Sequence, residues 1–360
     1  MAPGAADLKF VAGGLALVAA LAVCAAARAQ DAVEAFYRDR TVNLIVGYGP
    51  GGGYDVVARL VARHLGRFIP GHPKIIVQNM PGAGSMRAVN YLYAVAPKDG
   101  GTIGMFGRDM PMIGLIGNNP SAQFDARKFS WLGSSSSFAN DAYILLVRPG
   151  AAVKSIPDAR RPGAPPLVLA GTGEGATDGD VPKILRDMLG IGIKQVLGYP
   201  DTPSIFLAVE RGEVDGRTFD FTAVKSMRPD WLKPGSGYSI LLQFARRTRH
   251  PDLPAVPTAR EFAPDAAARA LIEFAETPLL TMARPVAAPP GLPPERARAL
   301  REAFWAVHRD AAFLTEAGDL GVDISPVDAE GVLRGIDEMA QAPPAVVDYM
   351  RRLLAGKGGG

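Results

Sequence analysis

Two glycine-rich loops contain the residues of this sequence that are best placed to bind a ligand. The first loop spans Gly47 to Gly53 (GYGPGGG), and the second spans Gly171 to Thr177 (GTGEGAT). Each follows an apolar run and precedes a helical pattern, so its backbone N–H groups point out of a predicted helix N-terminus, which favours an anion. Glycine allows positive φ angles and a close approach by the ligand. The loops therefore indicate anion binding; the alternative is that each is a tight connection without a ligand.

The first loop also matches G-x-G-x-x-G, the motif of dinucleotide-binding sites. That motif requires an acidic residue at the end of the second strand, where it binds the ribose. Here the second predicted strand ends in Gln78 and Asn79, and Pro50 removes one N–H donor from the loop. We therefore expect no dinucleotide and no other cofactor.

Residues suited to catalysis or to metal binding are few. The histidines occur in no H-E-x-x-H motif and at no metal-ligand spacing, and the sequence contains no G-x-S-x-G. Asp178 and Asp180 lie close together, but paired acids beside a glycine loop are typical of cap and turn residues. We therefore expect neither an enzyme nor a metal site. The histidines are His64, His72, His250 and His308.

The patterns that flank the loops predict the elements that position them. The apolar run from Val42 to Val46 predicts a strand, and apolar residues three or four apart between Val57 and Phe68 predict a helix with one buried face. The same order of strand, glycine turn and helix returns about 125 residues later. Strands that alternate with helices imply right-handed crossovers and parallel sheets. We expect an α/β protein with two lobes, each a mostly parallel sheet flanked by helices.

The two lobes set the expected position of the ligand and the domain boundaries. Such loops lie at the carboxyl ends of parallel strands, so we expect the ligand cleft between the lobes. The chain is predicted to cross near residues 141–143 and to return near residues 250–254. The expected division is residues 30–142 and 253–350 in lobe 1, residues 143–252 in lobe 2, and residues 351–360 in a flexible tail.

Residues 1–29 have the features of a secretory signal peptide. Phe10 to Ala27 carries no charge, and Ala27-Arg28-Ala29 is a small-x-small cleavage site. The alternatives are an uncleaved membrane anchor and lipid attachment at Cys24, in a segment that resembles a lipoprotein cleavage box. Cys24 is the only cysteine, so the mature chain would contain no disulfide and no cysteine metal ligand. We expect an exported protein.

The composition excludes several classes of protein. Apolar residues make up 48% of the chain, which is enough for sizeable cores and excludes wholesale disorder. The 39 basic and 36 acidic residues give a formal charge of +3, too small an excess to indicate a surface that binds nucleic acid. A length of 360 residues fits two domains.

The first glycine loop is one of five motifs that together resemble a known family. Gly49 to Asp55 (GPGGGYD) resembles the P-G-G-x-x-D loop of the periplasmic receptors of tripartite tricarboxylate transporters, the Bug family. The similarity extends over nearly all of the mature chain. The other motifs, in the family's order, are Asn79–Gly84 (NMPGAG), Ala96–Gly100 (APKDG), Arg211–Asp215 (RGEVD) and Leu253–Thr258 (LPAVPT).

This resemblance implies a two-lobed periplasmic-binding-protein fold of the Venus-flytrap type. Such a receptor closes on a small organic carboxylate in the periplasm and delivers it to the membrane permease subunits of a tripartite transporter. We expect it to be a monomer without catalytic activity. A sensory receptor that presents its ligand to a membrane signalling protein is the alternative.

The resemblance also implies which residues bind the ligand. In the family, backbone amides of the first loop hold the ligand carboxylate, and the loop of the second lobe holds the other end. Arg108 and Arg217 depart from the family, and each would either pair with a second ligand carboxylate or lie solvated at the rim. Asp55 would repel an anion, so its expected role is to order the first loop through backbone N–H bonds. The complete expected set is Tyr48, Pro50, Gly51, Gly52, Gly53, Tyr54, Asp55, Arg108, Gly171, Thr172, Gly173, Glu174, Thr177, Tyr199, Arg217 and Asp220.

Overall fold

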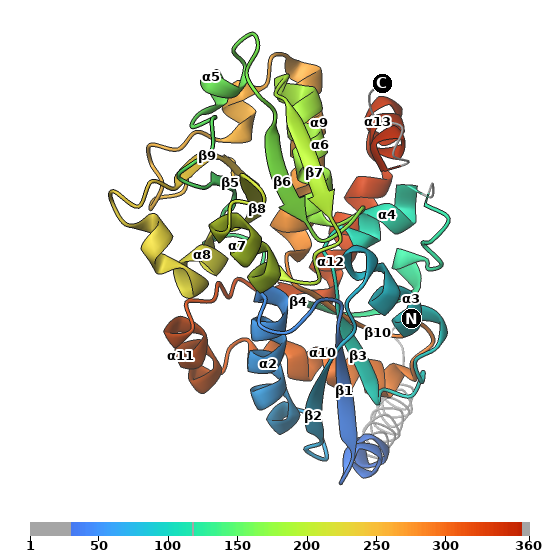
Figure 1. Cartoon of the computed structure of the whole chain (residues 1–360). Coiled ribbons are helices and arrows are strands. Elements are labelled where there is room, and N and C mark those ends of the chain that lie inside the picture. Colours follow the sequence, from blue (N-terminus) through green and yellow to red (C-terminus); the bar gives the residue numbers. More distant parts are fainter. Residues whose placement is uncertain (1–29, 117–118, 355–360) are drawn as a thin grey trace, which may run out of the picture.

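Two β-sheets flanked by helices form the two lobes of the molecule (Figure 1). The structure is a computed structural model that describes residues 30–116 and 119–354. The predicted signal peptide, with Cys24, lies outside the described residues, and so do residues 355–360 of the predicted tail. None of the described helices is long and apolar enough to cross a membrane.

The sheet of lobe 1 has the strand order β11-β4-β10-β3-β1-β2. The first three strands of the chain are parallel, and β10 runs antiparallel to both β3 and β4, so β4 points the same way as they do. β11 is antiparallel to β4. The strands are β1 (Thr41–Val46), β2 (Lys74–Asn79), β3 (Thr102–Met105), β4 (Ser130–Ser134), β10 (Pro285–Ala288) and β11 (Val327–Asp328).

Helices pack on both faces of this sheet. The successive residues Trp131 and Leu132 of β4 lie in different hydrophobic clusters, because side chains alternate between the faces of a strand. A helix over residues 30–37 precedes β1. The helices on the side of Leu132 are α2 (Gly53–Leu65), α10 (Pro294–Val307) and α11 (Ala311–Asp319), and those on the side of Trp131 are α3 (Met86–Ala94), α4 (Met110–Ile116) and α12 (Ala329–Ala340).

The sheet of lobe 2 has the strand order β7-β6-β8-β5-β9. β6 is parallel to β7 and β8, whereas β5 is antiparallel to both of its neighbours. The strands are β5 (Tyr143–Val147), β6 (Leu167–Gly171), β7 (Ile193–Leu197), β8 (Gly216–Asp220) and β9 (Ser239–Phe244). The helices of this part of the chain are α5 (Ile156–Ala159), α6 (Thr177–Leu189), α7 (Thr202–Glu210), α8 (Phe221–Met227) and α9 (Ala266–Met282). The predicted fold of two α/β lobes with mostly parallel sheets is confirmed.

The two segments that cross between the lobes lie side by side. Ser135 N–H donates to the carbonyl of Arg284, and Ala283 N–H donates to the carbonyl of Ser136, both at 3.0 Å. The first crossing leads into β5 and the second leads into β10, and each of these strands runs against its neighbours in the sheet that it enters. The paired crossings therefore connect the two sheets as a two-stranded link.

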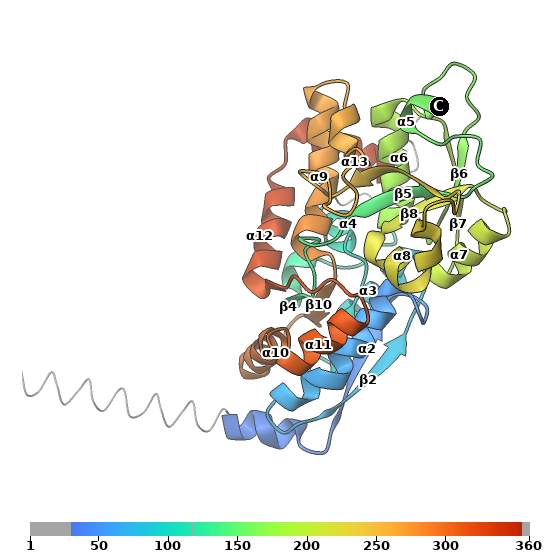
Figure 2. The same ribbon diagram turned by 90° about the vertical axis from the view of Figure 1, so that its left-hand side faces the viewer.

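The chain returns to lobe 1 at Ala283 and Arg284, which is later than the return that was expected near residues 250–254. Thr258 forms a parallel bridge with Gln243 of β9, and α9 lies beside α6 (Figures 1 and 2). Residues 253–262 therefore accompany lobe 2, although they were expected in lobe 1, and α9 packs against α6 of lobe 2 and α12 of lobe 1. A helical pattern predicts a buried face but does not specify which sheet buries it.

The last described helix, α13 (Pro344–Leu354), extends into the segment that was expected to be a flexible tail. Residues 351–354 belong to this helix, whereas the prediction began a flexible tail at residue 351. The helix is held because Met350 and Leu353 are buried in the cluster that also contains α4 and α6. The remaining short helices are η1 (Gly66–Phe68), η2 (Ala83–Ser85), η3 (Ala126–Lys128), η4 (Pro229–Leu232) and η5 (Ala259–Phe262).

Candidate functional site

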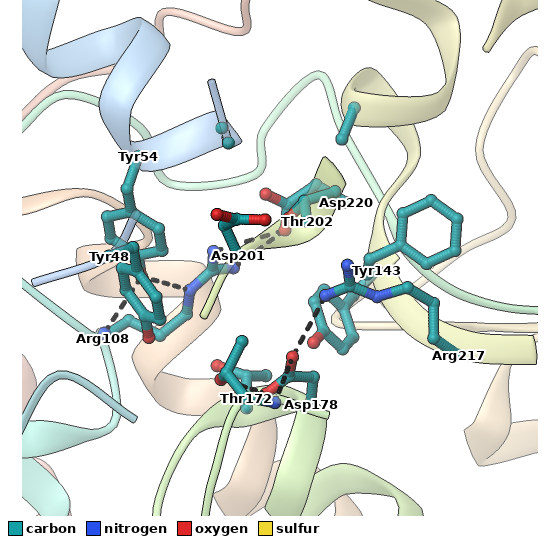
Figure 3. Close-up of a pocket in the computed structure, with 15 residues that line it drawn as sticks. Tyr48, Tyr54, Arg108, Tyr143, Thr172, Asp178, Asp201, Thr202, Arg217 and Asp220 are labelled. Carbon is teal, nitrogen blue, oxygen red and sulfur yellow. Dashed lines mark hydrogen bonds and ion pairs between the residues drawn. The ribbon is translucent and has the colours of Figure 1, made fainter. Parts of the chain in front are cut away.

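A cavity of about 60 Å³ lies between the lobes, where four strands end. Its walls include Tyr48 after β1, Arg108 after β3, Thr172 after β6 and Asp220 at the end of β8. Figure 3 shows these side chains converging around one space. Open α/β sheets bind ligands beyond the carboxyl ends of their strands, so this cavity is the candidate site.

The N-terminus of α2 opens onto the cavity. Gly52 is the N-cap residue, Gly53 is the first residue of the helix, and both line the cavity. The first N–H groups of a helix have no partner within it, and the N-cap residue Gly52 has no side chain that could accept from them. A Cβ on Gly53 would lie 3.2 Å from Nη2 of Arg284, so a larger residue would crowd the arginine. The backbone thus presents amide donors and the positive end of a helix dipole to the cavity.

Asp55 orders the loop that precedes α2. Its Oδ2 accepts hydrogen bonds from the backbone N–H of Gly51 and from Nε of Arg59, both at 2.8 Å. Its Oδ1 accepts from Nδ2 of Asn79, also at 2.8 Å. Burial acts to raise the pKa of Asp55, but these donors outweigh it and hold the pKa below its ordinary value. Asp55 has the loop-ordering role that was predicted, and it does not line the cavity.

Two arginines clamp the carboxylate of Asp220. Nη1 and Nη2 of Arg108 each lie 3.3 Å from Oδ1, and Nη2 of Arg284 donates to Oδ2. Nε of Arg108 donates to Oη of Tyr54 at 3.0 Å. Burial acts to raise the pKa of Asp220, but the charges of Arg284 and Arg108 outweigh it and keep the pKa below its ordinary value. Asp220 is therefore ionised, with both oxygens bound by arginine.

A second buried ion pair lines another wall of the cavity. Nη2 of Arg217 lies 3.1 Å from Oδ2 of Asp178. Thr172 donates to the same carboxylate, from Oγ1 at 2.8 Å and from its backbone N–H at 3.1 Å. Burial raises the pKa of Asp178 against the opposing charge of Arg217. Nη1 of Arg217 is buried and has no hydrogen-bond partner among the described residues, so the N–H donors of this nitrogen are free.

Contacts between the lobes hold the cavity closed. Gly49 N–H donates to the carbonyl of Pro200 at 3.2 Å, and Oγ1 of Thr177 donates to Oδ2 of Asp109. The pair of Arg108 and Asp220 also joins lobe 1 to lobe 2. Burial raises the pKa of Asp109 to about 6. The structure is therefore a closed arrangement in which both lobes share the cavity.

The structure places the expected site residues in three groups. Gly173, Glu174 and Tyr199 line a neighbouring groove that shares Tyr48 and Thr172 with the cavity. The expected residues that line the cavity itself are Tyr48, Gly52, Gly53, Tyr54, Arg108, Thr172, Thr177, Arg217 and Asp220. Both Arg108 and Arg217 are buried, at 2% and 4% exposure, so neither is a solvated rim residue.

Four expected residues line neither space, for local reasons. Pro50 and Gly51 are exposed, and the N–H of Gly51 is occupied by Asp55. Asp55 itself points into its own loop. Gly171 is buried at the end of β6, where a Cβ would lie 2.8 Å from the carbonyl oxygen of Asp178. Gly171 serves the close packing of β6 on α6 rather than the cavity.

Several lining residues were not expected. Asp201 and Thr202 reach the cavity from the start of α7, where Asp201 caps the helix by accepting from Ser204 N–H at 2.9 Å. An Asp two residues before Pro203 is a helix-start signal, but it does not show that this helix end faces the other lobe. The others are Tyr143, Asp178, Phe219 and Ala223.

The site offers no assembled place for a metal ion. In residues 30–116 and 119–354, no group of three or more His, Cys, Asp or Glu has an arrangement that would hold one. The acids that line the cavity are instead bound by arginine side chains, by a threonine and by the start of a helix. The donors that remain open suit an anion.

The fold is shared with periplasmic binding proteins of known structure. The periplasmic binding protein BugD has 18% identity and a TM-score of 0.67, with coverage of 88% of this chain and 98% of that chain. MatC from Rhodopseudomonas palustris with bound malate has 21% identity and a TM-score of 0.63 over 86% and 99% of the two chains. A second R. palustris protein, with adipate, has 20% identity and a TM-score of 0.66 over 88% and 97%. No family model matches the chain, and no curated protein matches it. At these identities the likeness establishes the two-lobed fold.

Proposed function

We propose that this chain is a periplasmic solute-binding receptor of the Bug family, which captures a small organic carboxylate between its lobes and delivers it to a tripartite transporter permease. The shared fold and the five sequence motifs support this assignment. Two of the solved structures of this fold contain the dicarboxylates malate and adipate. The proposal extends carboxylate binding to this chain.

The observation that carries the proposal is the pair of open donors in the cavity. Gly52 and Gly53 line the cavity at the start of α2, where the N-cap glycine has no side chain to accept from the first amides, and Nη1 of Arg217 is buried without a partner in the described part of the chain. A buried donor without a partner costs free energy, and a ligand acceptor removes that cost. A carboxylate at the helix N-terminus also gains from the helix dipole.

The same geometry supports binding rather than catalysis. The described residues that line the cavity include no His, Ser or Cys that would act as a nucleophile or as the usual general base. Asp178 and Asp220 are each held in an ion pair with arginine. The paired crossings give a hinge about which the lobes would open to release the ligand.

Delivery to a permease requires that the receptor leave the cytoplasm. Residues 1–29 are proposed to direct export and to be removed, which leaves a periplasmic protein that begins at residue 30. Mass spectrometry of the exported protein tests this step, because a chain retaining the signal sequence would indicate an anchor and a lipid mass on Cys24 would indicate a lipoprotein.

A thermal-shift screen of the purified protein tests the binding function. The panel contains mono-, di-, tri- and aromatic carboxylates, each beside the matching amide or alcohol as a control. A ligand at 100 times its dissociation constant adds about 2.7 kcal/mol of stability, which corresponds to several degrees for a chain of this length. Calorimetry then confirms stoichiometric binding of each hit. A panel in which no carboxylate stabilises the protein more than its control would contradict the proposal.

A further inference from the structure

Asp220 is bound in the way that a receptor binds a ligand carboxylate. Both terminal nitrogens of Arg108 meet one oxygen, and Arg284 from the second crossing meets the other. The three charged groups are nearly excluded from solvent, with 8% exposure for Asp220 and 6% for Arg284. Charge-assisted bonds from arginine to carboxylate are among the strongest polar contacts in proteins. Asp220 belongs to the chain itself, so this carboxylate is permanently present.

We propose that Asp220 takes the place of a second ligand carboxylate, so that the receptor selects ligands with a single carboxylate. This inference rests on the proposed function and specifies its substrate class. The proposed ligand class differs from the ligands in two solved structures of the same fold, because malate and adipate each have two carboxylates.

The balance of charge around the cavity supports this selection. The cavity is lined by two arginines and three aspartates, and Arg284 binds one of these aspartates from outside the lining. No positive side-chain charge of the described walls is therefore left over to neutralise a dianion. Burying a charge without a partner is strongly unfavourable. One anionic group finds compensation at the N-terminus of α2, whereas a second would have to displace Asp220 or Asp178 from its arginine. The charged groups are Arg108, Arg217, Arg284, Asp178, Asp201 and Asp220.

The free donor on Arg217 fits the uncharged end of such a ligand. The charge of Arg217 is already matched by Asp178 at 3.1 Å, and the remaining Nη1 needs only an acceptor oxygen. An amide or hydroxyl oxygen supplies that acceptor without adding a charge. The structure therefore points to a monocarboxylate whose other end carries a neutral polar group.

Matched ligands that differ only in the second charge test the selection. Succinate, glutarate and adipate are each compared by calorimetry with the monoamide of the same length, namely succinamate, glutaramate and adipamate. We expect the wild-type protein to bind the best monoamide at least about tenfold more tightly than its dicarboxylate. A wild-type preference for the dicarboxylate overturns the inference and leaves the proposed function intact. If neither these compounds nor any other carboxylate binds, the proposed function fails as well.

Removal of the internal carboxylate gives an independent test. In Asp220→Ala, Arg108 and Arg284 would face a vacated space, and we expect the preference between monoamide and dicarboxylate to reverse. Acetate, used as a probe, should raise the melting temperature of this variant more than chloride does at equal ionic strength. An unchanged ligand preference in a folded Asp220→Ala protein contradicts the inference. If the variant does not fold, the comparison of monoamides with dicarboxylates on the wild-type protein still tests the inference.

Asp141→Ala provides the matched control for acetate. Asp141 is buried near Asp220, at 2% exposure, but its carboxylate is bound by the backbone N–H groups of Ala142 and Thr222 and by the Thr222 side chain rather than by an arginine. Its loss vacates a similar volume without freeing an arginine, so acetate should stabilise this variant no more than chloride does. Equal stabilisation of both variants by acetate would show a nonspecific effect and contradict the role of the arginine pair.

Discussion

Substitution of Arg284 by Met tests the energetic role of the buried charge cluster. Arg284 is 6% exposed and is the donor to Oδ2 of Asp220, while Arg108 holds Oδ1. Removing one partner of a buried pair costs about 3–5 kcal/mol, and we expect the lower end because Arg108 remains. Unfolding entropy near 2.1 cal/mol/K per residue gives about 0.7 kcal/mol/K for this chain, so a loss of about 3 kcal/mol lowers the melting temperature by about 4 °C at pH 7.

The effect should shrink in acid. In the wild type, arginine holds the pKa of Asp220 below its ordinary value, so the stability that this group contributes is present at neutral pH and is lost only as the pH falls through the lowered pKa. Without Arg284, less charge opposes the effect of burial, so the pKa of Asp220 is higher than in the wild type and the variant protonates Asp220 earlier as the pH falls. The difference in stability between the two proteins should therefore be largest near pH 7 and smaller near pH 4.

Urea denaturation at a series of pH values measures this difference. The control is Arg38→Met, because Arg38 forms an exposed ion pair with Glu34, with side chains 63% and 47% exposed, and such pairs contribute at most about 1 kcal/mol. In a double-mutant cycle, Asp220→Asn should recover much of the stability lost in Arg284→Met. A loss no larger than that of the control, or one that stays constant with pH, would refute the reasoning.

Three further predictions concern the loop, its anchor and a buried histidine. Gly52→Val should abolish carboxylate binding in a thermal-shift assay, because a Cβ there lies 3.7 Å from the N–H nitrogen of Thr202 and the branches would fill the cavity; retained affinity would contradict the site. Asp55→Ala should weaken the same ligand at least about tenfold by freeing the Gly51 loop, measured by calorimetry, and an unchanged Kd would show that the loop is ordered by other contacts. Burial lowers the pKa of His308 to about 4, so wild-type stability should fall by roughly 3 kcal/mol between pH 6.5 and pH 4 from this residue alone. His308→Phe should lack that component in urea titrations, and an identical pH profile would disprove it.

The local features of the chain could be predicted from the sequence because they depend on neighbouring residues. The apolar positions Val57, Leu60, Val61 and Leu65 recur at helical spacing and are all buried on α2. Asp55 lies four residues after Gly51, close enough to bond its N–H once α2 forms. Alternation of strand, glycine turn and helix likewise predicted the two lobes and the edge of each sheet at which a ligand would bind.

The partners of the buried charges depended on the tertiary structure. Arg108 and Asp220 are separated by 112 residues, and Asp220 and Arg284 by 64. The sequence identified Arg108, Arg217 and Asp220 as candidates at strand ends, but it did not show that Asp220 would pair with Arg108 and Asp178 with Arg217. Arg284 gave no signal, because its position depends on where the second crossing returns to the first sheet. Hydrophobic periodicity and turn chemistry are encoded locally, so the sequence determined the elements and the glycine loops. Which charges meet depends on strand order and on how the lobes pack, so only the tertiary structure decided that Asp220 places a carboxylate of the chain itself in the cavity.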